Sequence, residues 1–182
     1  MKHNYQELWN QFKENLIKSL EECPEAEIEK IRSISQRTSF YFEYLLPKVA
    51  SKINLLFTTE EPFRVDGTFY RIGKQDGKNL KIPIILLESE NDYSTSEGEV
   101  KKLCLLNAPL KILMIYSDWD GAFSNDIKEG FWEYIMEDFN TDSSLTGFFV
   151  FINCSWNKNL RFDAIVYDEN VKCLGESALF VR

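Results

Sequence analysis

The chain has 182 residues, which is enough for one domain with a substantial buried core. Its 44% hydrophobic and 14% aromatic content favours a folded globule over a disordered chain. The net charge of −8 argues against a simple nucleic-acid-binding protein, because such proteins normally carry a basic surface. No apolar stretch approaches the roughly 20 residues of a membrane span, so we expect no membrane partner.

The cysteine and histidine content narrows the chemistry further. Four widely spaced cysteines without a C-x-x-C pair predict reduced, mostly buried thiols in a cytoplasmic protein: Cys23, Cys104, Cys154 and Cys173. The single histidine, His3, lies at the N-terminus, so neither a structural zinc site nor histidine-based catalysis is expected. The N-terminus also lacks the continuous apolar core of a secretory signal.

Helices are predicted at the N-terminus, followed by strands with two further helices among them. Apolar residues at 3.6-residue spacing predict a helix over 5–21, and Pro24 favours the start of a second one, which Pro47 should kink or divide. Strand-like segments are expected at 53–58, 63–72, 82–90, 110–118, 147–156 and 160–171, with a turn at 73–79 and helices over 97–107 and 125–138. The acids of 118–126 are assigned to capping. This order predicts an α/β fold with a mixed sheet covered by helices.

Two glutamates close the apolar strand at 82–90. Residues i and i+2 of a strand point to the same face, so Glu88 and Glu90 should project together, and Asp66 in the preceding strand-like segment can join them. Three converging carboxylates repel one another unless a cation offsets their charge. A hard divalent cation, Mg²⁺ or Mn²⁺, is the expected partner of such oxygen ligands.

The β-β-β-α-β order, an aspartate on the second strand and E-x-E on the third resemble the PD-(D/E)xK nuclease superfamily, with its restriction-endonuclease-like αβββαβ core. The resemblance covers about 36–118, within a single domain (1–182) that also has N-terminal helices (5–46) and a C-terminal α-β-β elaboration with a hairpin (119–182). It implies catalytic roles for Asp66, Glu88 and Glu90, with Lys101 or Lys102 replacing the usual lysine. It also implies metal ligation by Asp66, Glu88 and Glu43.

Each of these residues also has a simpler interpretation. The E-S-E segment is often the polar start of a loop, and Asp66-Gly67 is a turn signal. Lys101, Lys102 and Glu43 can be solvated helix residues. Lys111, Arg64 and Arg71 can form a basic rim with the two helical lysines, or ordinary surface.

The resemblance implies a metal-dependent endo- or exonuclease that hydrolyses phosphodiester bonds, of DNA more than of RNA. Two alternatives stay open: a catalytically degenerate nuclease fold acting as a binding or assembly module, and an acidic inhibitor-type protein that covers a basic partner. The expected partners are nucleic acid and a protein partner or a second copy in a homodimer.

Overall fold

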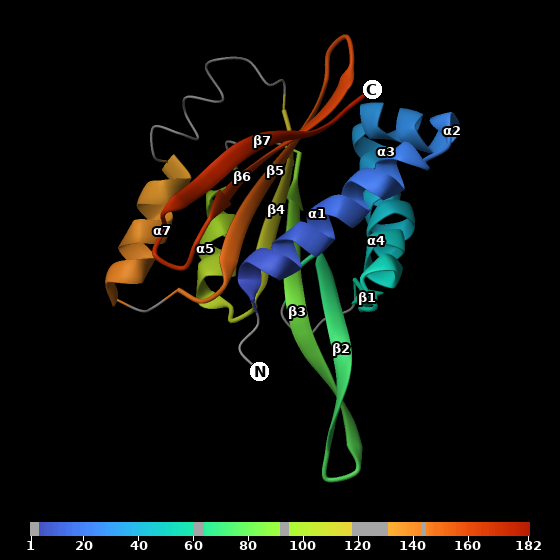
Figure 1. The fold of residues 1–182 in the computed structure, drawn as a ribbon. Coiled ribbons are helices and arrows are strands. Elements are labelled where there is room, and N and C mark those ends of the chain that lie inside the picture. The colour runs from blue at the N-terminus through green and yellow to red at the C-terminus, as the bar shows by residue number, and fades with distance from the viewer. Residues whose placement is uncertain (1–3, 60–63, 92–94, 118–130, 143–144) are drawn as a thin grey trace. The chain divides into compact units, whose positions relative to one another are not determined.

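The computed structural model describes residues 4–59, 64–91, 95–117, 131–142 and 145–182. The chain forms two compact units, Met1–Leu87 and Glu88–Arg182, each of which is described by itself. Figure 1 gives the element labels. The sequence prediction of a single domain with three parts stays a prediction. The capping role assigned to 118–126 and the start of the helix expected from 125 lie outside the described residues.

Helices form the first part of the N-terminal unit. Helix α1 (Tyr5–Glu21) has the predicted bounds, and its first turn is capped by the Asn4 side chain, which accepts a hydrogen bond from the backbone N–H of Glu7 at 3.2 Å. The region after Pro24 is broken into short pieces: α2 (Glu25–Ile28), η1 (Glu29–Arg32), α3 (Ile34–Ser39), the π-helical η2 (Phe40–Leu45) and α4 (Leu46–Lys52). Pro47 lies in the first turn of α4, and the backbone stays helical on both sides of it, so the helix is not divided at this proline; a kink there stays a prediction.

Three antiparallel strands complete this unit: β1 (Leu56–Thr58), β2 (Gly67–Gln75) and β3 (Lys78–Glu90), whose last three residues belong to the other unit. The aromatic ring of Phe12 in α1 meets that of Phe69 in β2 edge-on, with centroids 5.7 Å apart. Both side chains are fully buried, so the apolar stripe of α1 packs on the strands as its 3.6-residue period predicts.

The predicted turn at 73–79 is shorter than expected. Only Asp76 and Gly77 lie outside the strands, and both have positive φ angles, 51° and 76°. Two central residues of positive φ are the signature of a two-residue type I′ hairpin turn, whose twist matches that of the flanking strands. The neighbouring polar residues therefore stay in the ladder and lengthen the hairpin.

The C-terminal unit is built on four strands: β4 (Leu110–Tyr116), β5 (Phe148–Trp156), β6 (Leu160–Tyr167) and β7 (Cys173–Val181). Strands β4 and β5 are parallel, whereas β5–β6 and β6–β7 are antiparallel, so this sheet is mixed. The predicted C-terminal hairpin is therefore incomplete. The sequence prediction missed β7, because this edge strand is largely exposed and lacks a buried face with period two.

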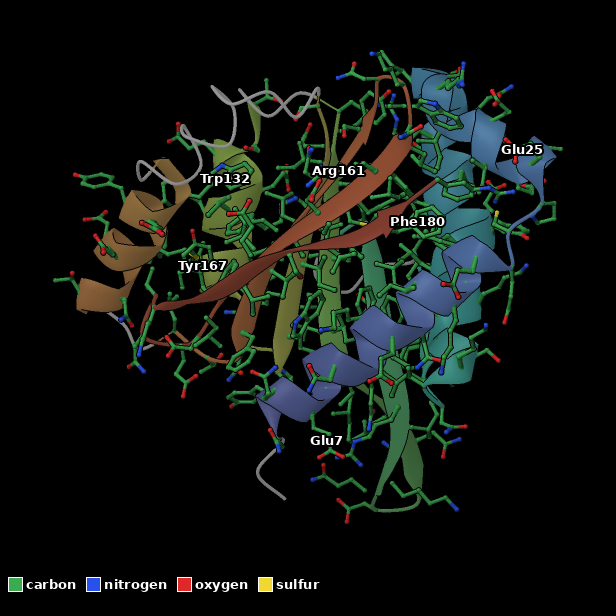
Figure 2. The ribbon with its side chains drawn as sticks, turned by 45° about the horizontal axis from the view of Figure 1, so that its top comes forward. Glu7, Glu25, Trp132, Arg161, Tyr167 and Phe180 are labelled. Atoms are coloured by element: carbon green, nitrogen blue, oxygen red, sulfur yellow. The ribbon has the colours of Figure 1, made fainter. Side chains whose placement is uncertain are left out.

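Helices α5 (Glu97–Leu105) and α7 (Phe131–Asp142) pack against one another in this unit. The indole ring of Trp132 in α7 stacks on Phe151 of β5 at a centroid distance of 4.3 Å, and its Nε1 donates a hydrogen bond to Oγ of Ser96 at 3.0 Å. Figure 2 shows Trp132 and Tyr167 among these elements. The ring of Tyr167 meets Phe151 edge-on, so one aromatic cluster joins α7 to β5 and β6.

Candidate functional site

A buried carboxylate near the end of β3 is bound by a lysine of α5, and both residues belong to the C-terminal unit. The side chain of Glu88 is 1% exposed, and its Oε1 lies 2.8 Å from Nζ of Lys102. The same ammonium group lies 2.5 Å from Oε2 of Glu99, three residues earlier on the helix. One lysine therefore bridges a buried carboxylate and a half-buried one.

The charge of Lys102 is favoured by its two partners. Burial alone would lower its pKa, but hydrogen bonds and attraction to Glu88 and Glu99 outweigh that effect and raise the pKa above its ordinary value. The side chain is 33% exposed, so part of it lies at the surface. This arrangement offers a fixed positive charge beside a fixed negative one.

Glu90 follows Glu88 by two residues on the same strand and is half-buried. Its Oε2 accepts a hydrogen bond from Oγ1 of Thr95 at 3.4 Å, a long contact. Strand β3 includes both glutamates, and alternation along a strand would place them on the same side, which stays a prediction. Glu90 is the more accessible of the two carboxylates, since Glu88 is fully enclosed.

Lys101 and Lys102 have different environments although they are adjacent. Successive residues of an α-helix point about 100° apart, so only one of the two can be directed towards Glu88. Lys101 instead forms an ion pair with Glu97 on the exposed side of α5. Of the two lysines considered for the site, only Lys102 contacts one of its carboxylates.

Asp66 and Glu43 both belong to the N-terminal unit. Asp66 is exposed and lies just before β2 instead of within a strand, which corrects its predicted position: the ladder begins at Gly67, and the residues before it bend. Glu43 is exposed on the π-helical segment η2. The convergence of these residues with Glu88 stays a prediction.

The predicted Mg²⁺ or Mn²⁺ needs several oxygen ligands in one place. Within the described ranges, no three acidic, cysteine or histidine side chains gather in a way that fits a metal ion. The carboxylate of Glu88 is instead neutralised by an ammonium group. The predicted metal ion stays a prediction.

Lys111 of β4 is the feature that the sequence interpretation missed. It was expected on an exposed basic rim, but it is fully buried, with Nζ 3.3 Å from the carbonyl oxygen of Leu106 and 4.4 Å from the centroid of the Phe149 ring. Burial lowers the pKa of Lys111 to about 8, and burial likewise raises that of the neighbouring Cys104 thiol to about 11. A lysine within an uninterrupted apolar strand is the signal that identifies it, since neither face of such a strand meets water.

The four cysteines are free thiols, and three of them are buried, as predicted: Cys23, Cys104 and Cys154. Cys173 on β7 is exposed. A nucleophilic cysteine needs a lowered pKa and an accessible sulfur atom. Cys104 has neither, so its environment is that of a structural thiol.

No family model and no curated protein matches the chain. Two solved structures resemble parts of it. One is a cysteine-to-alanine mutant of an amidase of the nitrilase superfamily from Nesterenkonia AN1, with 14% identity over 68% of this chain and 40% of that one, at a TM-score of 0.36. The other is a carbon-nitrogen hydrolase from Helicobacter pylori G27, with 8% identity over 87% of this chain and 68% of that one, at a TM-score of 0.37.

These matches are to an amidase and a carbon-nitrogen hydrolase and not to nucleases. The prediction of a PD-(D/E)xK nuclease with a restriction-endonuclease-like fold was wrong, and so was the nuclease activity. The two alternatives find no support either. The chain is an α/β protein with mixed strand pairing. The motif misled because its aspartate lies outside the strand, and because the buried glutamate is held by a lysine.

The TM-scores are too low to assign an activity to this chain, and the chain spans only 40% of the amidase. The carbon-nitrogen chemistry in the two names is therefore that of the two proteins. Among the helices that the structure describes, none combines the length and apolar character needed to cross a membrane.

Proposed function

We propose that this protein is a hydrolase of acyl bonds, with Glu90 and Lys102 as catalytic residues and Glu88 as a positioning residue. The observation that carries the proposal is the contact of 2.8 Å between the buried Glu88 carboxylate and the ammonium group of Lys102, whose side chain is partly exposed. A buried charge pair of this kind costs desolvation energy, which favours a role in function over a role in stability.

The chemistry follows from charge and access. Glu90, the more accessible carboxylate, takes a proton from a water molecule, whose oxygen attacks the carbonyl carbon of the substrate. The negative charge that develops on the carbonyl oxygen is stabilised by the ammonium group of Lys102. When the tetrahedral intermediate collapses, the bond to the leaving group breaks, and the protonated Glu90 returns its proton to that group.

Glu88 acts through Lys102 and does not touch the substrate. It is enclosed, and its ion pair limits the positions that the flexible lysine side chain can adopt. Glu99 provides a second anchor on the same helix. A single fixed ammonium group suits one developing oxyanion, as in ester or amide hydrolysis.

The test is multiple-turnover hydrolysis of p-nitrophenyl esters and acyl p-nitroanilides. Glu90→Gln should lower kcat by about 10²–10⁴-fold, and Lys102→Met by about 10²–10³-fold, while Lys102→Arg keeps part of the rate. Glu88→Gln should lower kcat with little change in KM, because it frees the ammonium group without removing it. Lys101→Met is the matched control, since Lys101 pairs with Glu97 on the exposed side of the same helix.

Wild-type rates in Glu90→Gln, or an equal loss in Lys101→Met, would contradict the proposal. So would the absence of turnover with every probe. A chelator arm separates the metal prediction: activity lost in EDTA and restored by Mg²⁺ or Mn²⁺ would overturn the metal-free assignment and favour the cation that the sequence predicted.

A further inference from the structure

The β2–β3 hairpin of the N-terminal unit is a positively charged arm in an acidic chain. Residues 71–81, here called the arm, contain one acid, Asp76, and four cationic side chains, Arg71, Lys74, Lys78 and Lys81. The arm thus carries a net charge of +3, whereas the whole chain carries −8. All five charged residues are exposed, and Figure 1 shows the tip of the hairpin extending beyond β1 and the helices of its unit. The charge of the arm indicates an anionic partner.

The arm is an ordered element. Its pairing runs without interruption from Arg71↔Ile82 to Gln75↔Lys78 and closes in the tight turn at Asp76 and Gly77. A hairpin closed by a two-residue turn has a fixed register, so each side chain has a defined face. An arm that is already folded loses little conformational entropy when it binds.

The cationic side chains lie on both faces of the arm. Residues opposite one another on paired strands share a face, and so do residues two apart on one strand. One face therefore carries Arg71 and Lys78. The other face carries Lys74 and Lys81. An element that meets a flat surface uses one face, so charge on both faces suits a partner that encloses the arm from two sides.

The apolar side chains of the arm do not favour a membrane. Ile72 is 45% exposed and Leu80 is 41% exposed, but the two project from opposite faces. The residues of the tip, from Gln75 to Lys78, are polar or glycine. Binding within a bilayer interface needs apolar side chains gathered on one surface, which the arm does not offer.

The acidic charge of the rest of the chain does not cancel that of the arm. The residues outside 71–81 together carry −11, the difference between −8 and +3. At about 3.3 Å per residue, the turn lies roughly 13 Å beyond the pair Arg71↔Ile82 at the base of the arm. The Debye length at 0.15 M ionic strength is about 8 Å, so charges at the base are largely screened at the tip. The acidic remainder therefore weakens the binding of a polyanion without preventing it.

We propose that the arm binds double-stranded DNA by entering the major groove, where its two faces meet the phosphates of the two strands. The groove is about 12 Å wide and admits a two-stranded β-ribbon. Both walls of the groove are rows of phosphates, which matches the cations on both faces of the arm, whereas the surface of an acidic protein would meet one face. Phosphate contacts carry no sequence information, so this binding is independent of sequence. The proposal does not depend on the hydrolase function.

The test is binding of the full chain to a fluorescently labelled DNA duplex, measured by anisotropy over a series of salt concentrations. If each of the four cations neutralises one phosphate, log K should fall with log salt at a slope of about −3.6. The affinity should then drop on the order of a hundredfold between about 0.05 M and about 0.2 M salt.

Two variants of the arm test which residues make these contacts. The triple variant Lys74→Gln, Lys78→Gln, Lys81→Gln leaves one cation, Arg71, so the slope should decrease to about −0.9. The same three lysines changed to Glu should abolish binding, because the arm then has the charge of its partner.

The matched control reverses three exposed lysines outside the arm, Lys48→Glu, Lys158→Glu and Lys172→Glu. Each exchange of Lys for Glu removes two units of charge, so this control and the Glu variant of the arm both carry −14. The control should keep the steep salt dependence, and circular dichroism verifies that every variant is folded.

Absence of duplex binding by the wild-type chain at low salt overturns the proposal, and so does an equal loss of binding in the Glu variant of the arm and in its control. Poly-L-glutamate and vesicles that contain anionic lipid are added as competitors at equal charge concentration, and neither should displace the duplex. Displacement by poly-L-glutamate overturns the proposal in favour of an acidic protein, and displacement by the vesicles overturns it in favour of a membrane surface.

Discussion

Replacing Lys111 by methionine should stabilise the protein, and the gain should depend on pH. Lys111 is 0% exposed on β4, and within the described part of the chain no acidic side chain neutralises it. Burial lowers its pKa from the ordinary 10.5 to about 8. Methionine has a similar length and fills the same space without a charge, so the substitution removes the desolvation cost with little loss of packing.

The size of the effect follows from the difference in pKa between the folded and unfolded states. Each unit of pKa is worth about 1.4 kcal/mol, so a lowering from 10.5 to about 8 costs the fold about 3 kcal/mol when the group is charged in both states. Between pH 8 and pH 10.5 the unfolded chain binds more protons than the folded one, so the free energy of unfolding rises with pH. The cost is therefore complete below pH 8 and disappears as the pH approaches 10.5.

Lys111→Met should then raise the free energy of unfolding by about 2–3 kcal/mol at neutral pH, after allowance for the lost 3.3 Å contact with the Leu106 carbonyl oxygen. The gain in the free energy of unfolding should shrink towards zero, or change sign, as the pH approaches 10.5. Urea unfolding of both proteins at a series of pH values measures this difference, in which other titrating groups cancel. Lys101→Met on the exposed side of α5 is the control and should show no such dependence. A variant that is less stable at every pH, or a gain independent of pH, would refute the reasoning.

Two further predictions concern the C-terminal unit. In the native protein a thiol reagent should modify the exposed Cys173 rapidly, whereas Cys104 should react only after denaturation, since burial raises the pKa of its thiol to about 11. Mass spectrometry of the labelled peptides measures the order of modification, and fast labelling of native Cys104 would contradict the prediction. Trp132→Phe should lower the free energy of unfolding by about 1–3 kcal/mol, because it removes the 3.0 Å hydrogen bond to buried Ser96. Adding Ser96→Ala to that variant should cost less than Ser96→Ala alone in the urea-unfolding experiment, and full additivity would show that the bond contributes nothing.

The elements with a strong local period could be predicted from the sequence. Helix α1 has the predicted bounds because the spacing of Trp9, Phe12 and Leu16 leaves one apolar stripe, which packs in the core. Strand β4 could be located because an apolar run bounded by Pro109 and a polar segment has few other conformations available. The edge strand β7 could not, since its residues are largely exposed and its pairing with β6 is a long-range property.

The candidate site could be predicted in part. The position of Glu88 and Glu90 at the end of β3 follows from the length of the apolar run and the alternation of the strand. The partner of Glu88 depends on how helix α5 returns to the strand, which no local pattern specifies. The strand position predicted for Asp66 was wrong, because β2 begins at Gly67 and Asp66 lies in the bend before it. Its role in a site stays a prediction.

The three lysines of this region show why residue type alone did not identify the site. Lys101 and Lys102 are neighbours on one helix, yet the step of about 100° between them sends one to exposed Glu97 and the other to buried Glu88. Lys111 follows a few residues later, in a strand with no water on either face, where burial has lowered its pKa instead of an acid raising it. A lysine is therefore a surface charge at position 101, the counter-ion of a buried carboxylate at position 102 and a destabilising buried amine at position 111, according to its surroundings. The role proposed for Lys102 rests on its contact with buried Glu88 together with a side chain that is partly exposed.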